Sequence, residues 1–123
     1  MRWVAVLRED ELGQGSRREV QVEGRTVLLA HEQGRVYAFA PRCPHMGAPL
    51  MEAAIGEDGI LTCPRHHSRF DLATGEPVAW SPWPPVLGSV FRAVRRERPL
   101  AVYPVLVGDG VICVGFPDEQ GAA

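Results

Sequence analysis

Residues 63–70 read CPRHHSRF, which places a thiol three positions before one histidine and four before another. The chain has only four histidines and three cysteines in 123 residues, so the concentration is notable. Upstream, residues 43–45 read CPH and offer a second thiol and a second imidazole. The residues alone leave two interpretations open: a shared set of metal ligands, or two polar loops that are rich in imidazole.

The rest of the chain has the pattern of an all-β protein. Its apolar runs are rich in valine, isoleucine, tyrosine and phenylalanine, as is typical of half-buried strands. Turn dipeptides ending in glycine, which supplies the positive φ of a tight hairpin, separate them. The expected strands are 3–7, 19–24, 26–31, 36–40, 60–63, 101–107 and 111–116. The turn dipeptides are Glu23-Gly24, Gln33-Gly34, Asp58-Gly59 and Asp109-Gly110.

Residues 81–98, SPWPPVLGSVFRAVRRER, do not follow the strand pattern. Apolar residues recur there at helical spacing after two prolines, which predicts a short amphipathic helix over about 85–96. The arginines lie elsewhere on such a helix. They form either a solvated face or a surface that docks an acidic partner. These arginines are Arg92, Arg95, Arg96 and Arg98.

Composition limits the classes of function. A chain of this length forms one domain with its own core, and 46% hydrophobic with 23% charged residues is typical of a globular protein. The formal charge of -2 gives no general attraction to nucleic acid or to anionic membranes. The start, MRWVAVLRED, lacks the apolar core of a signal peptide. Three cysteines are too few for a disulfide framework. We therefore expect a soluble, cytoplasmic protein.

Two stretches carry a resemblance to a known family. CPHMGAPL (43–50) and CPRHHSRFDLATGEP (63–77) resemble the C-x-H and C-x-x-H boxes of Rieske proteins. The resemblance to the soluble Rieske-type ferredoxins that serve oxygenases is close. The tail RPLAVYPV (98–105) is also similar to that family's. The resemblance implies one Rieske [2Fe–2S] domain over residues 1–123, built of stacked antiparallel sheets. Its cluster-binding subdomain would consist of two loops within about 41–80. The segment 81–98 is longer than the loop that covers the cluster in that family, so the helix predicted from its spacing would be an insertion.

The resemblance also implies one [2Fe–2S] cluster per chain. Cys43 and Cys63 would hold one iron, and His45 and His66 would hold the outer iron. Neutral imidazoles in place of two thiolates make the oxidised cluster less negative, so such clusters have potentials of roughly -150 to +300 mV, against about -400 mV for plant-type clusters. Zinc is the competing metal. However, zinc sites usually pair C-x₂₋₄-C with H-x₃₋₅-H, whereas each box here mixes the two residue types.

Three residues beside the ligands are expected to tune or shape the site. Gly47 lies in a loop whose backbone amides can donate hydrogen bonds to a sulfur centre. Ser68 occupies the position where high-potential relatives have a serine that bonds a cluster sulfide, while Phe70 replaces their tyrosine. We therefore expect a low or intermediate potential. Ser68 is either a hydrogen-bond donor to the cluster or a solvated loop residue. His67 replaces a glycine of the family and is either solvated or a titratable group beside the cluster.

The remaining cysteine positions favour the ferredoxin type. Respiratory Rieske subunits have an extra cysteine in each box, and the two form a disulfide. Ala48 and Arg65 occupy those positions here, so that bridge cannot form. Cys113 stands alone in a strand-like run and is predicted to be a small buried hydrophobe.

The resemblance implies an electron carrier that is not itself an enzyme. It would pass single electrons from a flavin-dependent reductase to a terminal oxygenase. The alternative is the small subunit of an assimilatory nitrite reductase, whose partner would be the large subunit. A complete oxygenase would need two further histidines and a carboxylate for mononuclear iron, and only His31, which we take as structural, and His67 remain. The sequence does not identify the terminal partner, its substrate, the potential or the oligomeric state.

Overall fold

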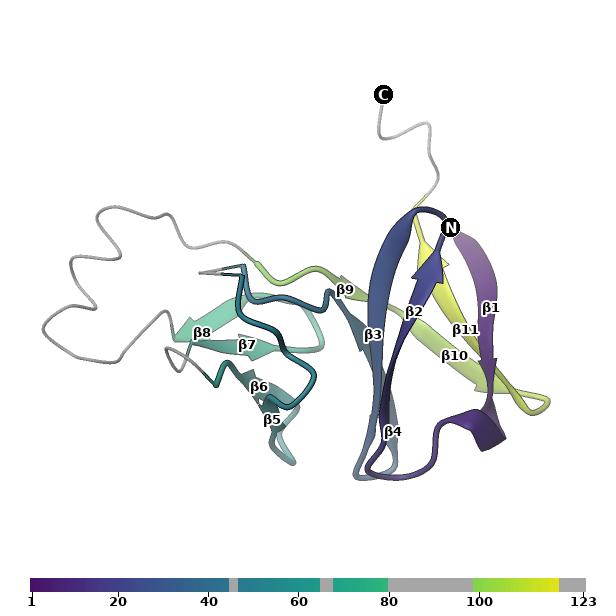
Figure 1. Ribbon diagram of the computed structural model, residues 1–123, viewed down its shortest axis with the longest axis horizontal. Coiled ribbons are helices and arrows are strands. Elements are labelled where there is room, and N and C mark those ends of the chain that lie inside the picture. Colours follow the sequence, from purple (N-terminus) through teal and green to yellow (C-terminus); the bar gives the residue numbers. More distant parts are fainter. Residues whose placement is uncertain (45–46, 65–67, 80–98, 118–123) are drawn as a thin grey trace, which may run out of the picture. The chain divides into compact units, whose positions relative to one another are not determined.

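The computed structural model describes residues 1–44, 47–64, 68–79 and 99–117 (Figure 1). The chain divides into two compact units, one formed by Met1–Phe39 with Tyr103–Ala123 and the other by Ala40–Val102. Strands dominate both units. Within the described residues, helix is limited to the short 3-10 turn η1 (Glu9–Glu11), and no helix there could cross a membrane. The predicted helix at 85–96 lies outside the described residues.

Two antiparallel sheets form the first unit. One has the strand order β1-β11-β10 and the other β2-β3-β4-β9, where β9 contributes Tyr103. The strands are rich in valine, leucine and isoleucine, and four consecutive residues of the central part of β3, Val27 to Ala30, are fully buried. The strands are β1 (Arg2–Arg8), β2 (Arg17–Val22), β3 (Arg25–Glu32), β4 (Arg35–Phe39), β9 (Val102–Tyr103), β10 (Val105–Gly108) and β11 (Val111–Phe116).

Tight hairpins fix the register of these strands. Both residues of each turn have positive φ, as type I′ turns require: 50° and 81° at Glu23-Gly24, 52° and 78° at Gln33-Gly34, and 54° and 77° at Asp109-Gly110. The sequence prediction of these three turns is confirmed. Asp58-Gly59 differs, because only Gly59 has a positive φ and its amide donates to the Gly56 carbonyl.

The core of the first unit lies between its two sheets. Every second side chain of β11 is fully buried, and β3 contributes from the other sheet, so the alternation of the sequence is realised in packing. The buried members of this core are Leu12, Val22, Val27, Leu29, Ala38, Ile112, Val114 and Phe116.

The second unit contains one sheet of short strands in the order β5-β6-β7-β8. Only β6 coincides with a predicted strand, because segments of two or three residues are too short to show a periodic pattern. These strands are β5 (Ala54–Ile55), β6 (Ile60–Thr62), β7 (Arg69–Asp71) and β8 (Pro77–Ala79). The predicted strand 101–107 is also divided, into β9 and β10. Pro104 separates them, because proline has no amide hydrogen to donate to a ladder.

Backbone contacts join the beginning and the end of the second unit. The Ala40 amide donates to the Ala101 carbonyl at 2.9 Å, and the Leu100 amide donates to the Gly75 carbonyl at 2.7 Å. Gly75 has a φ of 83°, and a Cβ added to it would lie 2.0 Å from the Leu100 oxygen. Only glycine allows the two segments to approach this closely.

Candidate metal centre

The two thiols occupy equivalent positions in two loops of the second unit. The Cys43 amide donates to the Ala48 carbonyl at 2.8 Å, and the Cys63 amide donates to the Ser68 carbonyl at 2.8 Å. Each cysteine is therefore bonded to the residue five positions later. The next residues outward are also paired across each loop, as Arg42 with Pro49 and Thr62 with Arg69. The same pair of closing backbone contacts is thus present beside each thiol.

The first loop, residues 43–48, has additional internal support. The Gly47 amide donates to the Cys43 carbonyl at 2.8 Å, and Gly47 has a φ of 74°. The Arg42 guanidinium donates to the Gly47 carbonyl at 3.0 Å. Gly47 was expected to lie where an amide could donate to sulfur, but its amide is used within the loop. Its observed contribution is to the shape of the loop.

Both thiols are removed from water. Cys43 is 2% exposed and Cys63 is 0% exposed, and neither forms a disulfide. A buried thiolate is costly unless a cation compensates its charge. Two buried sulfur donors, each held by its own closed loop, therefore suit a centre that binds iron or another thiophilic metal.

Ser68 is also fully buried, with 0% of its surface exposed. Among the described residues it is the only polar residue that is buried. The interpretation of Ser68 as a solvated loop residue is therefore wrong. Phe70, two residues later, is equally buried and has no hydroxyl to offer. The side chain of Ser68 is thus removed from water, and its backbone carbonyl is bonded to the Cys63 amide.

The histidine half of the predicted site lies outside the described residues. This applies to His45 and His66, the expected ligands of the outer iron, and also to His67. The structure therefore brings the two cysteines into equivalent loops and leaves the assignment of the imidazoles as a prediction. The donor set fits a Rieske cluster as far as it is described.

An open pocket of about 320 Å³ is lined by residues of both loop regions. Pro64 follows Cys63 directly, and Pro49 follows Ala48 at the end of the first loop. Met51 and Glu52 complete the lining. The two thiol loops therefore share one face of the second unit, and its described lining residues are three apolar residues and one acidic residue.

The third cysteine differs from its prediction. Cys113 is partly exposed and lies in β11 of the first unit, opposite Ala5 of β1 and Leu106 of β10. Ala5 is exposed and Leu106 is 56% exposed. Side chains alternate along β11, and the buried set is Ile112, Val114 and Phe116, so Cys113 points to the outer face. The prediction that Cys113 is buried was therefore wrong, because the buried side chains are those of its neighbours, Ile112 and Val114.

The role of Gly75 is not apparent from the sequence. Gly75 lies within the second box and contacts the backbone of Leu100. The available signal was its place in Thr74-Gly75-Glu76, since a turn with an αL position favours glycine. The long-range partner had no local signal.

Comparisons with known proteins agree with this centre. The family model for the Rieske [2Fe-2S] domain matches residues 2–104. The 3-phenylpropionate/cinnamic acid dioxygenase ferredoxin subunit of Photorhabdus laumondii is 29% identical over 111 residues, which is 90% of this chain and 91% of the relative. Human apoptosis-inducing factor 3 is 36% identical over 72 residues, but that match spans 58% of this chain and only 12% of the human protein.

Solved structures give the same result. The ferredoxin of carbazole 1,9a-dioxygenase from Nocardioides aromaticivorans aligns with a TM-score of 0.68 at 29% identity, covering 93% of this chain and 97% of the ferredoxin. A chain from a complex of reduced oxygenase and oxidised ferredoxin in carbazole 1,9a-dioxygenase aligns with a TM-score of 0.65 at 26% identity, covering 91% of each chain.

The chain belongs to the Rieske [2Fe–2S] domain family. Its cofactor is a [2Fe–2S] cluster, and its nearly all-β fold of antiparallel sheets matches the Rieske ferredoxins.

Proposed function

We propose that the protein is a one-electron carrier that passes electrons to a terminal oxygenase and does not itself turn over substrate. The main support is the pair of equivalent buried thiol loops at Cys43 and Cys63, within a chain that matches an oxygenase ferredoxin over almost its whole length. A flavin-dependent reductase is the proposed electron donor.

The proposed ligands are Cys43 and Cys63 for one iron and His45 and His66 for the other. The cluster supplies reversible one-electron chemistry when bound. The chain contributes two closed loops that hold the sulfur donors away from water. It also contributes a mostly apolar face around Pro49 and Pro64, against which a partner can dock without displacing tightly bound water.

The ligand assignment is tested by exchanging neighbouring histidines. His66→Asn should abolish the visible absorption and the EPR signal of the reduced cluster, whereas His67→Asn should retain both. The two residues are adjacent, so the second variant controls for general damage to the loop. A cluster that survives His66→Asn and is lost in His67→Asn would reverse the assignment.

The carrier function is tested with purified components. The dithionite-reduced protein should give up one electron per chain when mixed with an oxidised terminal oxygenase, and product formation by the oxygenase and reductase should require its presence. Substrate conversion by the protein alone would contradict the proposal. So would a failure of the reduced cluster to transfer its electron to any oxygenase encoded beside it.

We also propose that the carrier acts in the cytoplasm. None of the three cysteines forms a disulfide, as is typical of a reducing compartment. Cell fractionation tests this placement. The small subunit of a nitrite reductase remains a sequence-based hypothesis, since no feature of the described residues favours it.

A further inference from the structure

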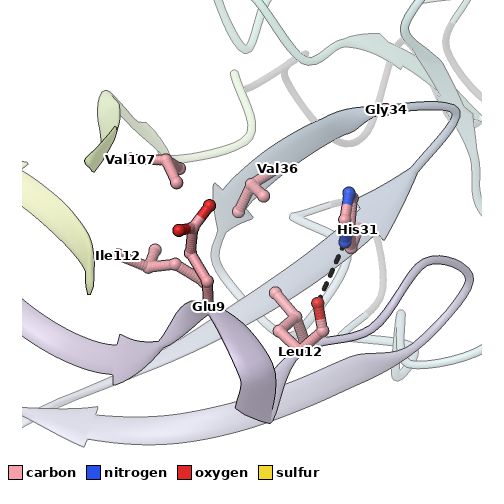
Figure 2. A pocket seen from close by; sticks show the side chains of 7 residues that line it. All are labelled: Glu9, Leu12, His31, Gly34, Val36, Val107 and Ile112. Carbon is pink, nitrogen blue, oxygen red and sulfur yellow. Dashed lines mark hydrogen bonds between the residues drawn. The ribbon is translucent and has the colours of Figure 1, made fainter. Parts of the chain in front are cut away.

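A second pocket, of about 170 Å³, opens in the first unit (Figure 2). None of its lining residues belongs to either thiol loop. Its walls are mainly aliphatic, and two polar side chains, Glu9 and His31, stand among them. The other lining residues are Leu12, Gly34, Val36, Val107 and Ile112.

The ring of His31 is held in one orientation. Its Nδ1 lies 2.9 Å from the Leu12 carbonyl oxygen (Figure 2). A carbonyl oxygen only accepts, so Nδ1 must carry the hydrogen, and in the neutral ring Nε2 keeps a lone pair. The backbone of His31 is fixed as well. Its amide donates to the Ser16 carbonyl at 3.0 Å, and its carbonyl accepts from the Gly15 amide at 2.6 Å. His31 therefore supplies the pocket with an oriented hydrogen-bond acceptor.

Glu9 supplies a negative charge at an exposed position on the rim of the pocket. Its amide donates to the Gly110 carbonyl at 2.9 Å, which fixes the backbone. In Figure 2 its carboxylate points between Val36 and Val107. The adjacent acids have cationic partners, since Asp10 lies 3.3 Å from Arg8 and Glu11 lies near Arg8 and Arg18. Within the described part of the chain, no hydrogen bond or ion pair is formed by the Glu9 carboxylate.

The pocket thus combines two acceptors, one of them charged, with aliphatic walls. Two acceptors disfavour the binding of an anion. An alcohol could satisfy only one of the two acceptors, because its hydroxyl has one hydrogen to donate. A primary ammonium group brings three donors and a positive charge. We propose that this pocket binds a primary alkylammonium group. Its nitrogen donates to the Glu9 carboxylate with His31 Nε2 as a second acceptor, and a short alkyl stem packs on Val107 and Ile112. The group can belong to a free amine or to a lysine side chain.

The proposal is tested by titrating the cluster-loaded protein with n-butylammonium chloride. The methyl resonances of Val36, Val107 and Ile112 should shift in a saturable manner, and the Tm should rise relative to an equal concentration of sodium chloride. n-Butanol and butyrate should bind more weakly, by up to about fivefold, because neither has the positive charge that pairs with the exposed Glu9 carboxylate. Nα-acetyl-lysine methylamide distinguishes the sources: if it binds too, a lysine side chain fits, and if only butylammonium binds, the ligand is a free amine.

Variants locate the binding. Glu9→Gln should weaken n-butylammonium binding by up to about fivefold, the upper end for an exposed ion pair. Glu57→Gln, which removes an exposed carboxylate from the second unit, is the matched control and should leave it unchanged. His31→Asn keeps a donor toward Leu12 but removes Nε2, and should also weaken binding. Equal shifts with n-butanol, or undiminished binding in Glu9→Gln, would overturn the proposal, and neither result depends on electron transfer.

Discussion

Ser68 combines full burial with a hydroxyl in the loop that carries a cluster thiol. A buried hydroxyl needs a hydrogen-bond partner, and one that donates to a cluster sulfur stabilises the reduced, more negative state. Its removal should therefore lower the reduction potential.

We predict that Ser68→Ala lowers the potential by about 60 mV, which corresponds to roughly 1.4 kcal/mol for one electron, the strength of a hydrogen bond to a charged acceptor. Protein-film voltammetry measures the shift. Ser16→Ala is the control, because the Ser16 hydroxyl donates to the Gly13 carbonyl in the first unit. An unchanged potential in Ser68→Ala would show that the hydroxyl bonds elsewhere.

A second prediction at this scale concerns Glu23. A hydrogen bond from the Arg2 side chain lowers the pKa of Glu23. The folded-state pKa is thus depressed, so the contact stabilises the fold above the unfolded pKa, and that stability is lost as pH falls through the folded pKa. Arg2→Gln should raise the pKa of Glu23 toward its ordinary value in a carboxyl ¹³C titration.

The same titration contains its own control. The pKa of Glu11 is lowered mainly by a hydrogen bond from the Arg8 backbone, so Arg2→Gln should leave it unchanged. A shift of both carboxyls would indicate a general change of structure, and no shift of Glu23 would refute the Arg2 contact.

The sequence placed the cysteines in two boxes because their spacing is local, and the structure gives each cysteine the same closing hydrogen bond. Their assignment as ligands stays a prediction. Burial was harder to predict, because it depends on which face of a strand meets the core. Cys113 is partly exposed for that reason, while Ser68 is buried although it is a small polar residue.

At the scale of elements, Gly75 joins two segments that are distant in sequence. A Cβ at Gly75 would meet the Leu100 carbonyl oxygen at 2.0 Å, whereas a Cβ at Gly24 would meet nothing within 4 Å. Their φ values, 83° and 81°, are nearly the same. The pair therefore separates the cost of a clash from the cost of a positive φ.

We predict that Gly24→Ala costs about 1 kcal/mol, from backbone strain alone, and that Gly75→Ala costs several kcal/mol, since the backbone of residues 75 and 100 must move apart. Thermal unfolding followed by circular dichroism, together with cluster content, measures both effects. Equal losses of Tm in the two variants would show that the Gly75–Leu100 contact is unimportant.

Elements differed in how well the sequence predicted them. The long strands of the first unit carry alternation and I′ turns, which are local signals, and they were found. The short strands β5, β7 and β8 were missed, because their pairing depends on contacts within the second unit. Pro104 divides a predicted strand in two. Proline has no amide hydrogen, so its position indicated a break, but the continuous apolar run around it favoured a single strand.

At the scale of the whole molecule, the near balance of charge limits long-range steering of partners. With 13 basic and 15 acidic residues, the formal net charge is only -2. The sequence suggested that an acidic partner docks on arginines that lie outside the described residues, namely Arg92, Arg95 and Arg96. The described alternative is the face of the second unit around Pro49, Met51 and Pro64, which both thiol loops share.

We predict that the terminal oxygenase contacts this face, because electron transfer falls steeply with distance and the face adjoins both thiol loops. Met51→Glu places a charge in a mostly apolar contact, where its desolvation is unfavourable. It should lower the second-order rate constant for electron transfer to the oxygenase about tenfold, equivalent to about 1.4 kcal/mol, and leave the absorption spectrum unchanged. Leu106→Glu adds the same charge at a 56% exposed position of the first unit and should not slow transfer. If instead Leu106→Glu slows transfer and Met51→Glu does not, the oxygenase docks on the first unit.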